Sequence, residues 1–177
     1  TVSSTVIENG VKYVKTGTVD QPILAKTGDG ICIDWGYLYL PAINGTVSLA
    51  SDNDIKAAFF ANGTLPLSKK EIVSRKPSTM PTLAYVHDFG TVTGNVSSYA
   101  LIGYDEIEDI EYFYNRYKGY WAHGGKVTIF DQFDKLDRNY SSIMARCRAF
   151  DKMIYDDGVA SGSVKYAEIL SGAYRHV

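Results

Sequence analysis

ICIDWGYLYLPA, residues 31–42, alternates aromatic side chains with small or aliphatic ones. Successive side chains of a β-strand point to opposite faces of its sheet, so the alternation assigns each group to one face. The aromatic face holds Trp35, Tyr37 and Tyr39. The opposite face holds Gly36, Leu38 and Leu40. Because bulky side chains occupy both faces, we predict a strand that other elements cover on both sides.

The flanking sequence predicts more antiparallel β-structure. TVIENGVKYV, residues 5–14, places β-forming residues on both sides of Asn9-Gly10, the pair preferred in the tight turns of hairpins. TLAYVHDFG, residues 82–90, predicts a further strand that ends in a glycine-containing turn.

A short helix interrupts the strands in SLASDNDIKAAFFANGTLP, residues 48–66. Ser51 or Asp52 can cap its N-terminus by accepting a hydrogen bond from the backbone. Asn62-Gly63 can close it, because glycine readily adopts the left-handed conformation that ends helices.

From Asp105 onward the pattern changes to a helical period. GYDEIEDIEYFYNRYKGYW, residues 103–121, begins with Asp105 followed by Glu108, a spacing that resembles a capping box. Its apolar and aromatic side chains fall within one arc of a helical wheel. We therefore predict a helix from Asp105 to Trp121.

A second, longer helix gives the strongest periodic signal. Its apolar positions follow one another at intervals of four and three: Ile129, Phe133, Leu136, Tyr140, Ile143, Cys147, Phe150 and Ile154. This spacing forms a continuous stripe along a helix. Gly158 and Gly162 are predicted to end the helix, and Ser163 to cap a third one.

These patterns predict an α+β protein, with N-terminal antiparallel β-structure followed by long helices. We expect the β portion to span residues 1–92, a linker or short leading strand to span 93–104, and the helical portion to span 105–177. Because the chain opens in strand-like sequence and closes within a helical pattern, we expect it to be a fragment of a longer protein.

Composition restricts the partners. The net charge is −2 and the lysines and arginines are scattered, which argues against nucleic-acid binding. No run approaches the ~20 apolar residues that span a bilayer, so we expect no membrane partner. Cys32 and Cys147 are expected to be buried free thiols rather than a disulfide. No cysteine or histidine pair has metal-ligand spacing, and we predict neither a metal nor a cofactor.

Four asparagines begin Asn-x-Ser/Thr sequences, the acceptor pattern for N-glycosylation: Asn44, Asn62, Asn95 and Asn139. They are four of the seven asparagines in the chain, more than the frequency of serine and threonine predicts. This excess favours a secreted protein. The alternative is that Asn-Gly-Thr simply marks turns, which explains Asn44 and Asn62 alone.

Several segments occur in the order and spacing typical of one family: IDWGYLYLPA, FFANGTLP, AYVHDFG, GYDEIEDIEYF, YW and CRAFDKMIYDDGVASGSVKYAEILSGAYRH. In these segments, from about residue 30 to the end, the chain resembles the glutaminase A-like proteins, large secreted or periplasmic proteins of fungi and bacteria. The resemblance implies that the β portion is part of a β-sandwich and that the helices begin a six-hairpin-type α/α toroid.

The resemblance also implies hydrolysis of L-glutamine to L-glutamate and ammonia. The partners would then be a small-molecule amide substrate and the remaining domains of the parent chain. Because a toroid assembles its cleft from many hairpins, we expect this chain alone to be inactive.

Among the acidic residues, Glu106 is the main catalytic candidate and Asp105 a weaker one. In the predicted helix Glu106 falls within the apolar arc, where a carboxylate needs a hydrogen-bond partner or an opening onto a cleft. Burial would raise its pKa towards the range of a general acid. The alternative is a first-turn glutamate that bends back into water. Asp105 and Glu108 lie outside the arc and fit a solvated helix face.

Other candidates carry a simpler alternative. His87-Asp88 could be a base and its orienting carboxylate, but adjacent strand residues face opposite sides, so a packed histidine and a turn-forming aspartate are favoured. Five aromatic side chains could stack on sugar rings: Trp35, Tyr37, Tyr39, Tyr120 and Trp121. Trp35, Tyr120 and Trp121 are the substrate-binding candidates, although aromatic side chains more often supply core. The rival functions are a carbohydrate-binding or scaffold module with a glycan partner, and part of a glycoside hydrolase with a six-hairpin toroid.

Overall fold

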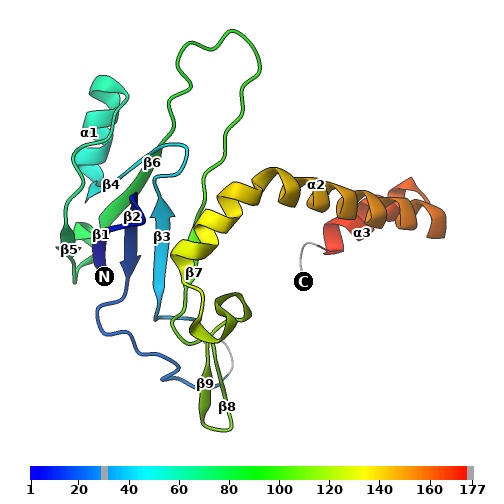
Figure 1. Cartoon of the computed structure of the whole chain (residues 1–177), viewed down its shortest axis with the longest axis horizontal. Helices are drawn as coiled ribbons and strands as arrows, with labels where there is room; N and C mark the ends of the chain where they lie inside the picture. Colours follow the sequence, from blue (N-terminus) through cyan, green and yellow to red (C-terminus); the bar gives the residue numbers. More distant parts are fainter. Residues whose placement is uncertain (29–31, 175–177) are drawn as a thin grey trace. The chain divides into compact units, whose positions relative to one another are not determined.

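The computed structural model describes residues 1–28 and 32–174 (Figure 1). The chain forms two compact units, Thr1–Phe133 and Asp134–Val177, which are described separately. Antiparallel strands in the N-terminal part are followed by helices in the C-terminal part, which confirms the predicted α+β class. The predicted domain ranges, the toroid and the longer parent protein stay predictions.

The larger sheet of the first unit has five strands in the order β5-β1-β2-β3-β7, each antiparallel to its neighbours. The strands are β1 (Val2–Glu8), β2 (Val11–Gly17), β3 (Tyr37–Pro41), β5 (Glu71–Val73) and β7 (Gly103–Asp105). The predicted hairpin joins β1 to β2, and its turn residues Asn9 and Gly10 have φ of 51° and 78°. Positive φ at both positions is what a type I′ turn requires.

A two-stranded sheet, β4 (Thr46–Ser51) and β6 (Pro81–Val86), packs on one face of the larger sheet. The buried contact between the two sheets consists of Val14, Val47 and Leu49, with Leu40 packed against them. β6 confirms the strand predicted in residues 82–90. Between β4 and β6 lie β5 and a short 3-10 helix, η1 (Pro77–Thr79).

The opposite face of the larger sheet receives the first turn of α2 (Ile129–Ser161). Tyr13 and Tyr39 from the sheet form a buried cluster with Ile129 and Phe133 from the helix. β3 therefore contributes Tyr39 to one layer and Leu40 to the other, as the alternating sequence predicted.

The predicted short helix is α1 (Asp52–Asn62). The Ser51 hydroxyl accepts a hydrogen bond from the backbone N–H of Asp54 at 3.1 Å, which caps the N-terminus. Gly63 closes the helix with a φ of 66°, and its N–H donates to the carbonyl of Phe59. Both caps were predicted.

The predicted helix from Asp105 to Trp121 is wrong. The segment forms the end of β7, a hairpin of β8 (Ile110–Tyr112) and β9 (Asn115–Tyr117), and the start of a 3-10 helix, η2 (Tyr120–Gly125) (Figure 1). β7 pairs with β3 across the sheet, a long-range contact that helical periodicity does not report. The segment is also rich in tyrosine, phenylalanine and isoleucine, which favour strands.

The long helix starts at Ile129 because Thr128 and Asp131 form a reciprocal cap. The Asp131 N–H donates to the Thr128 hydroxyl at 3.2 Å, and the Thr128 N–H donates to the Asp131 carboxylate at 2.8 Å. These bonds hold the pKa of Asp131 below its ordinary value.

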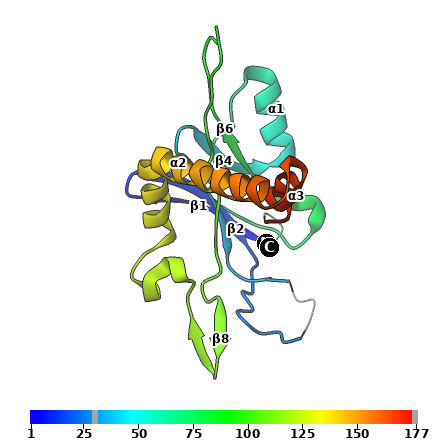
Figure 2. The same ribbon diagram turned by 90° about the vertical axis from the view of Figure 1, so that its right-hand side faces the viewer.

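The second unit contains the remainder of α2 and α3 (Val164–Tyr174) (Figure 2). α2 continues through Gly158, so the prediction that Gly158 ends it is wrong, whereas the predicted end at Gly162 is confirmed, since the last helical residue is Ser161. A Cβ on Gly158 would lie 2.7 Å from the Cα of Ala167, so the glycine lets α3 pack closely against α2. The predicted cap is confirmed, since Ser163 Oγ accepts the N–H of Tyr166 at 3.2 Å.

Two compositional expectations can be compared with the structure. Cys32 and Cys147 are free, as predicted, but both are exposed, so the expected burial is wrong. Among residues 1–28 and 32–174, no helix combines the length and apolar character needed to span a membrane.

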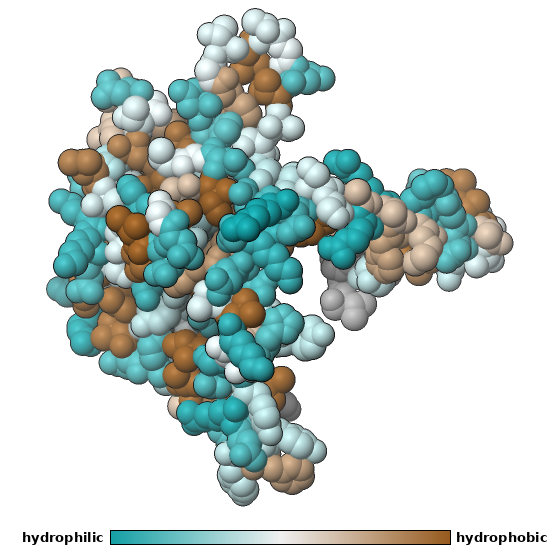
Figure 3. Space-filling view, in the orientation of Figure 1, coloured by the Kyte–Doolittle hydropathy of each residue, from teal (hydrophilic) through white to brown (hydrophobic). Residues whose placement is uncertain are grey.

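In the view of Figure 3, apolar and polar residues are intermingled over the surface of the first unit.

Gly103 sets the distance between the sheet and α2, and replacing it with valine should destabilise the first unit. A Cβ at this position would lie 2.7 Å from Phe133 Cζ and 3.2 Å from Ile129 Cδ1, and Phe133 is only 2% exposed. We expect Gly103→Val to lower the free energy of unfolding by about 1–3 kcal/mol, measured by denaturant titration. Gly94→Val is the matched control, since no atom lies within 4 Å of its added Cβ. Equal stability of the two variants would contradict this packing.

Candidate functional site

One small hollow in the first unit contains two of the residues selected from the sequence. It has a volume of about 220 Å³ and lies among β3, β7, η2 and the start of α2. Its lining includes Tyr39, Asp105, Lys118, Trp121 and Phe130. We call it the Asp105 pocket. It brings a carboxylate, an ammonium group and aromatic rings to one place.

Strand register places the charged groups beside these rings. Lys15 on β2 is directly opposite Tyr39 on β3, and Tyr37 on β3 is directly opposite Asp105 on β7. Pairs at these positions share one face of a sheet. Lys15 Nζ lies 4.1 Å from the centroid of the Tyr37 ring and 5.6 Å from that of Tyr39, within the range of cation–π attraction.

Burial perturbs the titration of this face. Removal of the Tyr39 hydroxyl from water raises the pKa of Tyr39 to about 12, and the neighbouring Asp105 and Tyr37 add to the shift. Burial lowers the pKa of Lys15, and the attraction of Asp105 opposes that change. Asp105 therefore acts electrostatically on groups from two other strands.

Local hydrogen bonds hold the polar lining in place. Asp105 Oδ1 accepts the backbone N–H of Ile107 at 2.9 Å, and Lys118 Nζ donates to the carbonyl of Ile107 at 2.9 Å. Gln132 donates to the carbonyl of Trp121 at 2.8 Å, which ties η2 to α2.

Glu106 lies in the turn after β7, not on a helix, so the reasoning that selected it does not hold. It is nonetheless partly buried. Burial raises the pKa of Glu106, and repulsion from Asp109 and Asp105 raises it further. A carboxyl group with this shift retains its proton at higher pH than an ordinary glutamate.

The three aromatic candidates lie in different environments. Trp35 is 6% exposed, and its indole N–H donates to the carbonyl of Glu108 at 3.0 Å, an arrangement typical of a core residue. Tyr120 is 94% exposed, whereas Trp121 packs beside the buried cluster and lines the Asp105 pocket. Substrate contact stays a prediction for all three, and the geometry favours Trp121.

The His87-Asp88 pair has local partners. Asp88 Oδ1 accepts the N–H of Gly90 at 2.7 Å, so it forms the expected turn. His87 packs edge-on against Phe89 with ring centroids 4.4 Å apart, and its Nδ1 contacts the carbonyl of Asn44. His176 lies outside the described residues. Within those residues, no group of three or more histidine, cysteine or acidic side chains is arranged to hold a metal ion.

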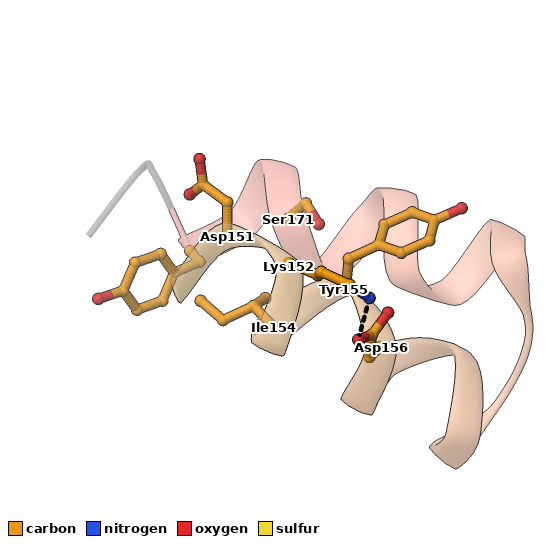
Figure 4. A pocket seen from close by; sticks show the side chains of 7 residues that line it. Asp151, Lys152, Ile154, Tyr155, Asp156 and Ser171 are labelled. Atoms are coloured by element: carbon orange, nitrogen blue, oxygen red, sulfur yellow. Dashed lines mark hydrogen bonds and ion pairs between the residues drawn. The ribbon is translucent and has the colours of Figure 1, made fainter. Parts of the chain in front are cut away.

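A separate groove lies in the second unit between α2 and α3 (Figure 4). It has a volume of about 430 Å³. Its Lys152 is paired with Asp156 at 2.6 Å, one helical turn away. It contains none of the residues selected from the sequence, and we assign no site to it.

Lys15 and Lys118 were not predicted near the site, whereas Tyr39 was among the aromatic side chains predicted to be able to stack on sugar rings. The position of Lys15 beside the site depends on the register of β2 and β3, which joins residues far apart in the chain, and Lys118 directly follows β9. The alternating positions of Tyr37 and Tyr39 in the sequence indicated which face of β3 contributes to the site. They did not indicate which residues of β2 and β7 lie opposite.

Tyr39 should make stability depend on pH in alkaline solution. Its pKa rises from about 10 in the unfolded chain to about 12 in the folded one, so the folded state keeps the proton over that interval. The resulting stabilisation is complete below pH 10 and is lost as pH rises towards 12. We expect the unfolding free energy of the wild type to fall more steeply in this window than that of Tyr39→Phe, measured by denaturant titration at each pH. Parallel profiles would refute the assignment.

Comparison with known proteins identifies a family. The family model of a domain of unknown function, DUF5127, matches residues 1–157. This range includes the whole first unit and most of α2. No curated protein matches the chain, and no solved structure matches it. The match covers well over half of the sequence, and the chain belongs to the DUF5127 family.

Proposed function

We propose that this chain is part of a glutaminase A-like amidohydrolase and that its Asp105 pocket contacts the substrate, L-glutamine. The observation that carries the proposal is the presence of both Asp105 and Lys118 in the lining of one small hollow that also contains aromatic side chains. An amino acid carries an ammonium and a carboxylate group on the same carbon. A site with one acid and one cation can bind both.

The size of the pocket supports a small ligand. Its volume of about 220 Å³ lies below the roughly 300–1,000 Å³ of pockets that hold drug-sized molecules. Trp121 and Phe130 supply apolar walls for the methylene groups of glutamine. The order of the sequence motifs and the α+β fold are also what we expect of a glutaminase A-like protein.

Glu106 is the candidate proton donor. Amide hydrolysis releases ammonia, and the leaving nitrogen must gain a proton as the C–N bond breaks. The raised pKa of Glu106 favours this role, because a general acid works best when its pKa approaches the working pH. Asp105 has the different role of binding and orienting the substrate ammonium group.

The proposal includes the setting of the activity. We infer a secreted or periplasmic hydrolase in which further domains of the parent chain complete the cleft. The present chain alone should then bind glutamine weakly and release no ammonia.

A second candidate function rests on a different observation. The β8–β9 hairpin exposes Tyr112, Phe113 and Tyr114 by 64%, 75% and 95%. Flat aromatic surfaces in water can stack on sugar rings, which favours a carbohydrate-binding module or part of a glycoside hydrolase. Loss of glycan-array binding in Tyr114→Ala, with binding retained in Trp121→Ala, would support this function over the amidase.

The proposal predicts different kinetic effects for neighbouring acids in the parent protein. Glu106→Gln should lower kcat for ammonia release by about 10²-fold or more, since it removes proton transfer. Asp105→Asn should mainly raise KM, since it removes a binding charge.

Glu108→Gln is the control, because it removes a carboxylate from the same turn and leaves Glu106 and Asp105 in place; of the three acids, Asp105 is the one that lines the pocket. Ammonia release is measured with L-glutamine over a range of concentrations. Near-wild-type kinetics for both Glu106→Gln and Asp105→Asn would remove this site from consideration.

A further inference from the structure

The N-glycosylation acceptor sequences fall at structurally different places. All four of their asparagines are exposed: Asn44, Asn62, Asn95 and Asn139. Asn44 lies in the turn between β3 and β4 with a φ of 57°, and Asn62 is the last residue of α1. Asn95 lies between β6 and β7, and Asn139 lies within α2. Three acceptors therefore lie in turns, loops or helix ends, where a modifying enzyme can reach the backbone.

Two of these acceptor sequences open onto the same hollow. It has a volume of about 640 Å³ and is lined by Asn44, Gly45 and Thr46 from one acceptor and by Gly63 and Thr64 from the other. We call it the acceptor hollow. The two sequences are distant along the chain, and α1, β4 and β6 bring them together (Figure 1).

Large apolar side chains are exposed in the acceptor hollow and on α1 just before Asn62. Leu67, which lines it, is 94% exposed. Phe59 and Phe60, just before Asn62 on α1, are 50% and 84% exposed. Phe59 is three residues before Asn62, so the two side chains are neighbours on the helix surface. An attached sugar could lay its apolar face on these groups.

Turn formation accounts for part of the pattern. Asn44 and Gly63 adopt the left-handed conformation that turns and helix ends require. Turn formation does not require the threonine that completes each acceptor sequence. It also does not require both sequences to line the same hollow. It also leaves Asn95-Val96-Ser97 unexplained.

We propose that Asn44 and Asn62 carry N-linked glycans that lie across the acceptor hollow. In the modification, the amide nitrogen of asparagine forms a bond to C1 of an oligosaccharide carried on a lipid pyrophosphate. The bond from C1 to the pyrophosphate oxygen breaks, the lipid pyrophosphate leaves, and the amide proton passes to a base of the transferase. The glycans cover Leu67 and Phe59 with amphipathic sugar rings.

The helical acceptor provides an internal contrast. Asn139 Nδ2 donates to the carbonyl of Lys135 at 2.8 Å, one turn earlier in α2. Its amide is engaged and its backbone is fixed in a helix, so Asn139 remains unmodified.

Intact mass after secretion tests the modification. The full chain is secreted from yeast behind a signal sequence, and its mass is measured before and after peptide:N-glycosidase treatment. Asn44→Gln and Asn62→Gln should each lose the mass of one glycan, and Asn139→Gln should lose none. Thr46→Ala and Thr64→Ala should give the same losses while keeping both asparagines. Absence of either loss, or a glycan on Asn139, would overturn the proposal.

Cysteine labelling tests where the glycans lie. In a chain with Cys32→Ser and Cys147→Ser, Leu67→Cys should react more slowly with a maleimide polymer when glycosylated than after substitution of both acceptor asparagines by glutamine. Tyr120→Cys is the control, since Tyr120 is 94% exposed and lies on η2, outside the residues of the hollow. Equal labelling of Leu67→Cys in both forms would show that the glycans leave the hollow uncovered.

Discussion

The burial of β3 on both faces is the constraint on which the first unit depends. Tyr39 packs with Ile129 and Phe133 of α2 on one side, and Leu40 packs with Val14, Val47 and Leu49 on the other. A one-residue slip would exchange the two faces and place aromatic rings in the space shaped for aliphatic ones. The strand therefore fixes its own register and that of β2 and β7, which pair with it.

The same register produces the Asp105 pocket. Once Tyr37 is paired with Asp105 and Tyr39 with Lys15, the Asp105 carboxylate, the Lys15 ammonium group and the two rings share a face of the sheet. Asp105 and Tyr39 of this group line the pocket. α2 then closes over this face because Gly103 leaves room for Phe133. The buried cluster that stabilises the sheet and the pocket that carries the proposed function are thus formed by the same contacts. A change in sheet packing is expected to alter the site.

Local signals predicted the elements whose geometry is local. Asn9-Gly10, the Ser51 and Gly63 caps and the stripe from Ile129 each specify a turn or helix within a few residues. The helix predicted from Asp105 onward is wrong because the segment begins in β7, which pairs with the distant strand β3. Its hairpin turn is formed by Phe113 and Tyr114 at φ of 46° and 63°, residues that give no turn signal.

Like the fold, the candidate site could be predicted from the sequence only in part. Glu106 and Asp105 were selected from the sequence. Glu106 was selected because of its position on a predicted helix, and the structure has a turn there instead. Its pKa is raised by burial and by the neighbouring carboxylates of Asp109 and Asp105. Lys15 could not be selected, because no feature of a lysine in a strand reveals which residue lies opposite. Lys118 follows the hairpin of β8 and β9, a segment that was predicted to be helical. A single sequence does not show which strands pair across a sheet or which residues then lie opposite one another.

The most direct test of the account is a titration of the chain with L-glutamine, followed by the indole N–H signals in ¹H–¹⁵N correlation spectra. The chain has two tryptophans, so Trp121→Phe assigns both signals. Trp121 lines the Asp105 pocket, whereas Trp35 is buried and hydrogen-bonded to Glu108. The account predicts a saturable shift of the Trp121 signal with little change at Trp35, and loss of that shift in Asp105→Asn. An unchanged Trp121 signal at high glutamine concentration would contradict it.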